Sequence, residues 1–205
     1  MGYSLSWLAV KGKPAQAIRD ELGFRPTGES EEFAESELSA VKMPNGWYII
    51  VSDHTERVVS EEAMRKLSLS GCELVTCFVE EHVMVSSATG WKDGRTIWSV
   101  IHDCRIGKSH LDVEGNLPPG FLSIRDVWLA RTTSGVDYIF EIPIETAASV
   151  TDYRHDRDVP ALSGDVFEVL ERLAPQMPPR QKPPLPQRSF SGRLFRRLFK
   201  RLFGV

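Results

Sequence analysis

Five side chains of this sequence have the chemistry that acid–base catalysis needs, and they fall in three places along the chain. Each place sets a histidine beside a carboxylate, the pairing that general acid–base catalysis uses near neutral pH. If the chain is an enzyme, we expect its site among these residues: Glu81, His82, His102, Asp103 and His155. The other interpretation is that they belong to polar loops with local ion pairs, which are common on protein surfaces.

Neither a metal site nor a cofactor site is indicated. Cys72, Cys77 and His82 are spaced by five residues, and an odd spacing within a strand points side chains to opposite faces. The sequence contains no CxxC pair, no phosphate-binding glycine loop and no GxSxG. We therefore expect no metal and no cofactor. Three cysteines, an odd number, are typical of reduced thiols in a cytosolic protein.

The elements that must position these residues follow a readable order from the N-terminus to Glu80. Alternating and β-branched runs predict four strands, at 3–10, 36–43, 47–53 and 73–80. One helix is predicted at 14–22, closed by Gly23, and a second at 60–69, where Ser60 is the expected cap. Strand, helix, strand, strand, helix, strand is the order of the ferredoxin-like motif.

Beyond Glu80 the patterns predict an extra hairpin and C-terminal helices. Asp93-Gly94 is a strong turn signal between predicted strands at 82–87 and 96–102. Trp91 falls in this loop and is a candidate contact residue, whereas the other tryptophans are expected in the core. The remaining patterns predict strands at 110–114 and 136–141, and helices at 118–131, 144–153 and 164–173. The expected class is α+β, with a largely antiparallel sheet and flanking helices.

Charge and proline content divide the chain into three parts: a globular domain at 1–173, an extended linker at 174–189 and a basic helix at 190–205. Six of the twelve residues from Pro175 to Pro186 are proline, a density that no helix or central strand tolerates. Eight basic residues lie from Arg180 onward and no acidic one does. The chain before Arg180 therefore has 17 basic and 28 acidic residues, a net charge of −11.

The strongest motif is the segment RLFRRLFKRLF near the C-terminus. At about 100° per residue, a helix separates this segment into one apolar half and one basic half. The apolar half contains Leu194, Phe195, Leu198, Phe199, Leu202 and Phe203, and the basic half contains Arg193, Arg196, Arg197, Lys200 and Arg201. This is the pattern of a helix that lies on an anionic lipid surface and folds on contact with it.

Two other partners for the basic helix stay open. Its apolar half could bind a hydrophobic groove, on this protein or on another, and the acidic domain would permit such docking electrostatically. Nucleic acid is the least favoured partner, because phosphate binding needs cations but has no need of six large apolar side chains.

Four segments carry a resemblance to known proteins: SLSWLAVKGK, VEEHVMVSSATGWKDGRTIWSVIHD, VDYIFEIPIETA and YRHD. Over residues 3–170 the chain resembles an uncharacterised family of bacterial proteins that has no assigned activity. The resemblance implies a bacterial, cytoplasmic setting, and it supplies no catalytic or binding residue.

Together these observations favour a non-catalytic bacterial binding protein. Its acidic domain suits a basic protein partner through electrostatic steering, and its tail suits reversible association with the anionic, cytoplasmic face of a membrane. The alternative is a small hydrolase-like enzyme with a site among the five residues named first.

Overall fold

The computed structural model describes residues 2–53, 58–131, 135–158 and 166–173. The chain divides into two units, Met1–Leu173 and Ala174–Val205, and the fold described below is that of the first. The predicted linker at 174–189 and the predicted basic helix at 190–205 both lie outside the described residues.

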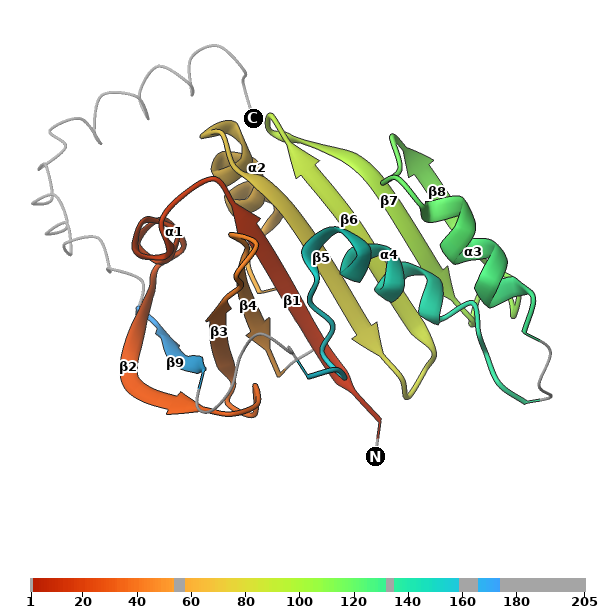
Figure 1. Cartoon of the computed structure of the whole chain (residues 1–205), viewed down its shortest axis with the longest axis horizontal. Helices are drawn as coiled ribbons and strands as arrows, with labels where there is room; N and C mark the ends of the chain where they lie inside the picture. The colour runs from red at the N-terminus through yellow and green to blue at the C-terminus, as the bar shows by residue number, and fades with distance from the viewer. Residues whose placement is uncertain (1, 54–57, 132–134, 159–165, 174–205) are drawn as a thin grey trace, which may run out of the picture. The chain divides into compact units, whose positions relative to one another are not determined.

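The described residues form an α+β fold around one antiparallel sheet of nine strands, with four helices (Figure 1). In sheet order the strands are β2 (Phe24–Glu31), β9 (Phe167–Arg172), β3 (Leu38–Lys42), β4 (Tyr48–Ser52), β1 (Ser4–Lys11), β5 (Glu73–Glu80), β6 (Val85–Lys92), β7 (Arg95–Asp103) and β8 (Asp112–Gly115). The helices are α1 (Ala15–Leu22), α2 (Glu61–Leu69), α3 (Phe121–Leu129) and α4 (Glu141–Thr151). Every neighbouring pair of strands is antiparallel, as the sequence predicts.

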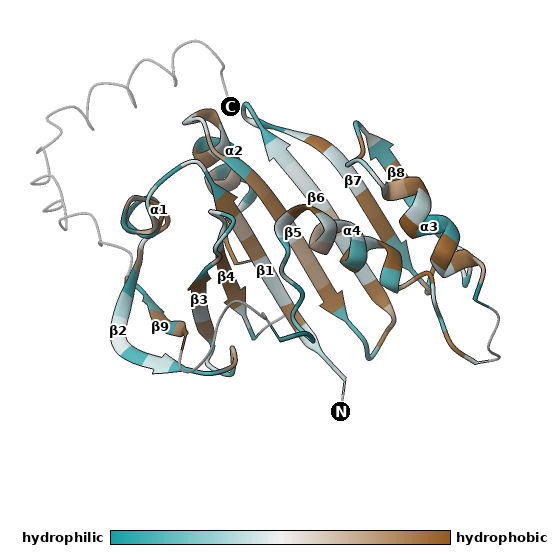
Figure 2. Cartoon of the chain, in the orientation of Figure 1, coloured by the Kyte–Doolittle hydropathy of each residue, from teal (hydrophilic) through white to brown (hydrophobic). Residues whose placement is uncertain are grey.

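The central strands are apolar on both faces because helices pack on both sides of them. Successive side chains of a strand point to opposite faces, so β1 contributes Trp7 and Ala9 to one core cluster and Leu8 and Val10 to another. The first cluster includes residues of α3 and α4, and the second includes residues of α1 and α2. Figure 2 shows the hydrophobic residues concentrated along the middle strands, with β6 paler than β5.

Local signals correctly predict where several elements begin and end. The hydroxyl of Ser60 accepts a hydrogen bond from the backbone N–H of Ala63, at 3.2 Å, and so caps α2. Helix α1 ends at Gly23, whose φ of 72° is left-handed. Asp93 and Gly94 both have positive φ, as the tight turn between β6 and β7 requires.

Strand β2 is absent from the sequence-based interpretation, and it lies between α1 and β3. The predicted ferredoxin-like order is therefore not confirmed. All but two residues of β2 are exposed, so it lacks the alternation of apolar and polar residues that reveals a half-buried strand. Its hydrogen-bonding partner is β9, which comes from the far end of the domain in the sequence.

Two predicted elements near the C-terminal end of the domain are wrong. The helix predicted at 164–173 is the strand β9 from Phe167, because Phe167 and Leu170 belong to cores on opposite faces of the sheet. Their spacing of three residues imitates a helical stripe. The strand predicted at 136–141 is also wrong, since α4 begins at Glu141 and includes Pro143 in its first turn, where proline is tolerated.

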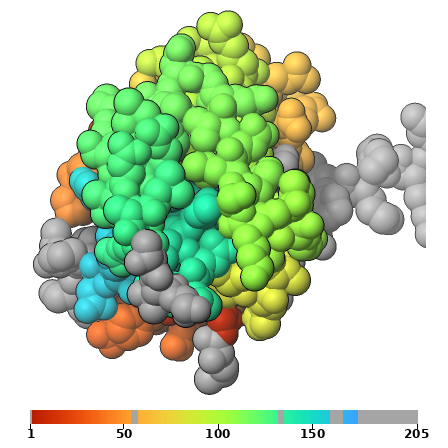
Figure 3. Space-filling view, turned by 90° about the vertical axis from the view of Figure 1, so that its right-hand side faces the viewer, coloured from red at the N-terminus to blue at the C-terminus, as the bar shows by residue number. Residues whose placement is uncertain are grey.

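Helix α3 lies within the range predicted for a helix at 118–131, and few of its residues are buried. Only Phe121 of this helix is fully buried, while Leu122 and Val127 are 60% and 58% exposed. Figure 3, which views the molecule from the side of α3 and β8, shows this helix on the surface. The apolar side chains of this helix are therefore only partly used for packing.

Candidate binding site

A row of polar side chains crosses four neighbouring strands on the sheet face opposite α4. Thr76 on β5 pairs with Thr89 on β6, Thr89 with Ser99 on β7, and Ser99 with Glu114 on β8. Residues directly opposite each other in an antiparallel sheet project to the same face. With neighbouring strands about 4.8 Å apart, the row of three hydroxyls and one carboxylate is about 14 Å long.

The next row on the same face is more apolar. Ser6 on β1 pairs with Phe78, Phe78 with Ser87, and Ser87 with Ile101. In this row, two hydroxyls alternate with an aromatic and an aliphatic side chain. The two rows together form a surface that offers both hydrogen bonds and apolar contact.

A cavity of about 540 Å³ stands over these rows. Its other walls come from the segment before α2 and the start of that helix, which lies behind one end of the sheet in Figure 1. The lining residues are Ser6, Trp7, Leu8, Val58, Val59, Glu61, Met64, Thr76, Cys77, Phe78, Ser87, Thr89, Trp91, Thr96, Ser99 and Glu114. Within the described part of the chain, the lining contains two carboxylates and no Lys, Arg or His.

Part of the cavity floor is already hydrogen-bonded and part is open. The hydroxyls of Thr76 and Thr89 are 2.6 Å apart, and Trp91 Nε1 donates to Thr89 Oγ1 at 3.1 Å. Ser87, Ser99 and Glu114 have no hydrogen-bonding partner among the described residues, although each lines the cavity. These three groups are therefore available to a ligand.

Trp91 does not lie in a loop, contrary to the prediction from the sequence. It is inside β6 and is 7% exposed, so it is a wall of the cavity and not a projecting loop residue. A bulge at Gly90/Trp91 changes the strand register at this point.

His102 is fully buried and holds a connecting loop against the sheet. Its Nδ1 donates to the carbonyl oxygen of His110 at 2.7 Å, and its Nε2 is 3.0 Å from Asp137 Oδ2. Both ring nitrogens therefore face acceptor oxygens of the protein. Asp137 also accepts from the backbone N–H of Ile139, just before α4. This network positions a loop and leaves neither ring nitrogen for a substrate.

Asp103 follows His102 in β7 and therefore projects to the other face. Its carboxylate accepts two hydrogen bonds from the Arg105 guanidinium, at 2.9 and 2.6 Å. These bonds are the main reason that its pKa falls to about 2. A carboxylate so firmly ionised is a poor proton donor near neutral pH.

Glu81 and His82 lie in the turn between β5 and β6. Glu81 Oε2 accepts from the backbone N–H of Tyr3 at 2.9 Å, and His82 Nδ1 is 2.8 Å from Glu80 Oε1. Both residues line a shallow cavity of about 470 Å³, together with Asp137. They are the two predicted residues that the structure brings into one cavity.

His155 is half-buried beside Tyr3, with ring centroids 4.8 Å apart in an edge-to-face contact. Burial lowers the pKa of His155 to about 4, so the ring is neutral at pH 7. Its Nδ1 has no partner among the described residues. None of the five predicted catalytic residues lines the larger cavity.

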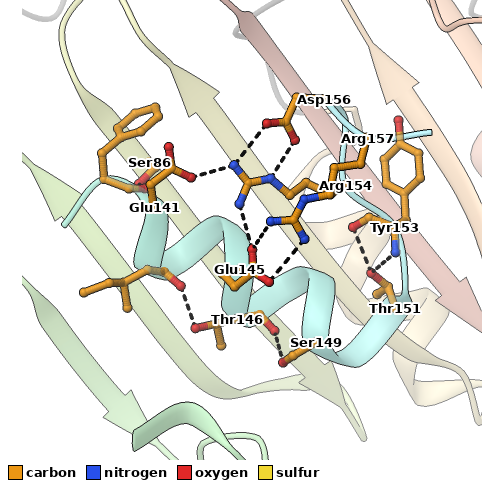
Figure 4. A network of polar contacts seen from close by, with 12 residues as sticks. Ser86, Glu141, Glu145, Thr146, Ser149, Thr151, Tyr153, Arg154, Asp156 and Arg157 are labelled. Atoms are coloured by element: carbon orange, nitrogen blue, oxygen red, sulfur yellow. Dashed lines mark hydrogen bonds and ion pairs between the residues drawn. The ribbon is translucent and has the colours of Figure 1, made fainter. Parts of the chain in front are cut away.

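The mixed-charge segment around His155 attaches to α4 through a buried arginine (Figure 4). The Arg154 guanidinium contacts Glu141 at 2.6 Å, Glu145 at 2.8 Å and Asp156 at 2.6 Å. Burial lowers the pKa of Arg154, but hydrogen bonds to Asp156 and Glu141 outweigh this and raise it above the usual value. The network holds this segment against α4 and therefore has a structural role. In the sequence, only the mixed charges of residues 152–158 indicated that ion pairs would form here.

Two further observations concern metal binding and membrane-spanning helices. Among the described residues, no three His, Cys, Asp or Glu side chains are grouped to hold a metal ion. None of the helices in the described ranges has the length and apolar character needed to cross a bilayer.

Fold and cavity define an α+β protein with a ligand-sized pocket on an open sheet face. Comparisons of the chain with models of protein families, with curated proteins and with solved structures give no match.

Proposed function

We propose that the protein is a non-catalytic bacterial binding protein that works at the cytoplasmic surface of a membrane. The domain at 1–173 binds a positively charged partner, and the basic amphipathic segment at 190–205 attaches the protein reversibly to anionic lipid. The observation that carries the proposal is the lining of the larger cavity, which, within the described residues, offers hydroxyls and two carboxylates and contains no Lys, Arg or His.

The geometry of the predicted catalytic residues supports binding over catalysis. His102 uses both ring nitrogens within the protein, and Asp103 is bound by Arg105. A general base must reach the proton that it removes from a substrate. The alternative, a small hydrolase-like enzyme, is supported by the shallow cavity that contains Glu81, His82 and Asp137. Loss of a hydrolytic activity in His82→Ala would favour that alternative.

Charge supports a positively charged partner. The chain before Arg180 has a net charge of −11, and such a field attracts cations from a distance and repels anions. The partner is a basic protein or another cation of matching charge. Electrostatic steering of this kind weakens as the salt concentration rises.

The tail supports the membrane half of the proposal. Five basic residues near an anionic surface contribute about 1 kcal/mol each, and inserted Leu or Phe side chains about 1.5–3 kcal/mol each before ordering costs. Even half of this total is enough for reversible binding. The linker at 174–189 separates the tail from an acidic domain that the same lipid surface would repel.

The strand order supports a finer description of the domain. The strands predicted between the N-terminus and Glu80 occupy consecutive places, β3-β4-β1-β5, and all are antiparallel. We infer a ferredoxin-like core into which β2 is inserted.

Co-sedimentation with liposomes tests the membrane half of the function. The full chain is compared with a chain that ends at Arg188 and with a full-length Leu198→Asp, Phe199→Asp variant, which keeps every basic residue. We expect only the unmodified chain to bind, only on anionic vesicles, and more weakly at high salt. Equal binding by the double variant would show that charge alone attracts the tail, and no binding by any chain would overturn the membrane role.

A further inference from the structure

We propose that the cavity on the sheet face is a binding site for a small aliphatic amine, of the diamine or polyamine class. This inference rests on the proposed function, because it names the chemistry of the cation that the acidic domain binds. It is carried by one juxtaposition: Glu114, a carboxylate without a partner among the described residues, stands at the end of a row of hydroxyls inside a ligand-sized cavity.

The lining selects for positive charge. Glu114 on β8 and Glu61 on α2 enter the cavity from different elements, and no basic side chain among the described residues lines it. An anion would meet the unpaired carboxylate of Glu114, and a neutral polyol would leave that carboxylate without a counter-charge. An ammonium group donates up to three hydrogen bonds and so satisfies a carboxylate and a neighbouring hydroxyl together.

The spacing of the row suits a chain of amines. Ser99 is the cross-strand partner of Glu114, and Thr89 is the partner of Ser99, so acceptor groups follow one another at about 4.8 Å. A three-carbon segment between two amine nitrogens places them roughly one strand spacing apart. Methylene groups between the nitrogens find apolar contact with Phe78 and Met64, which line the same cavity.

Isothermal titration calorimetry of the full-length chain with spermidine tests the site. Glu114→Gln removes the carboxylate of the row, and Ser99→Ala removes its neighbour. The matched control is Asp112→Asn, which removes the same charge from the same strand, two residues away, outside the cavity lining. All three positions are at least partly exposed, so the variants are expected to fold, and circular dichroism verifies this.

We expect saturable binding of spermidine by the unmodified chain, at least tenfold weaker binding by Glu114→Gln, severalfold weaker binding by Ser99→Ala, and a change of less than twofold in Asp112→Asn. Glucose, as a neutral polyol, is expected to give no binding heat. The proposal is overturned if spermidine does not bind, if glucose binds more tightly, or if the two acid variants weaken binding equally. Liposome binding by the tail is independent of these results, so the amine site can fail while the membrane role stands.

Discussion

Ser99 and Glu114 are direct cross-strand partners on β7 and β8, the last two strands at one edge of the sheet. A hydroxyl and a carboxylate thus stand side by side where the sheet ends, and neither has a partner within the described part of the chain. On the opposite face, the neighbouring residues of β7, such as His102, are buried under the loop that leads to α4. One strand therefore serves packing on one face and leaves the other open to a ligand.

The close approach of Gly90 to the Trp98 indole leaves no room for a side chain. A Cβ at position 90 would lie 2.1 Å from Trp98 Nε1. We expect Gly90→Ala to lower the free energy of unfolding by about 1–3 kcal/mol, because the buried ring must move. Gly107→Ala is the control, since no atom lies within 4 Å of its added Cβ. Urea denaturation measures both, and coincident midpoints would contradict the prediction.

The buried Arg154 should matter more to stability than its exposed neighbour Arg157. Replacing Arg154 by Met leaves the carboxylates of Glu141 and Asp156 without their cation, and we expect a loss of about 2–4 kcal/mol. Arg157 is 52% exposed and binds the same Glu145, so Arg157→Met should change stability by about 0–1 kcal/mol. Thermal unfolding compares them. A larger loss of stability in Arg157→Met would contradict the prediction and would show that the exposed ion pair contributes more than the buried one.

Acid should destabilise the domain through His155. Its pKa is about 4 in the folded protein and 6.5 as its ordinary value, so the unfolded chain binds more protons between these values. The stabilisation from the neutral ring is present above pH 6.5 and is lost as the pH falls toward 4. From pH 7 to pH 5 we expect a loss of about 2 kcal/mol. His155→Phe keeps a ring against Tyr3 and should remove this loss, as unfolding at both pH values will show.

His102 and His82 should differ sharply in their contribution to stability. His102→Ala removes a fully buried ring and two hydrogen bonds, and we expect a loss of about 2–4 kcal/mol. The side chain of His82 is 64% exposed, and its replacement by Ala should change stability by less than about 0.5 kcal/mol. Chemical denaturation measures the difference, and equal losses would show that the network around His102 contributes little.

Elements with local signals could be predicted from the sequence. The Ser60 cap, the end of α1 at Gly23 and the Asp93-Gly94 turn each act within a few residues, and the structure confirms all three. The α+β class and the antiparallel sheet follow from the same kind of signal. Residues 174–205, with the strongest motif, lie outside the described residues, so the basic helix stays a prediction.

The rest depends on contacts between distant parts of the chain. Strand β9 is buried on both faces, so its apolar residues fall at a helical spacing, and β2 lies at the edge of the sheet with little apolar pattern. The cavity depends on register across β5, β6, β7 and β8, and Ser, Thr and Glu at those positions show no pattern along the sequence. Ser87 and Thr89 are two residues apart and so share a face of β6, but Ser86 beside them breaks any regular alternation.

The position of β9 has a consequence for how the protein is made. This strand is the last of the domain to be synthesised, yet it lies between β2 and β3, both of which are complete once Lys42 has been added. At about 5–20 residues per second, a ribosome needs roughly 6–26 seconds to extend the chain from the end of β3 to the end of β9. During that interval β2 lacks β9, its one neighbour among the described strands, and β3 has an unpaired edge, a state that favours pairing with other chains. A nascent chain that stalls before Phe167 should therefore be a target for chaperones or a source of aggregation.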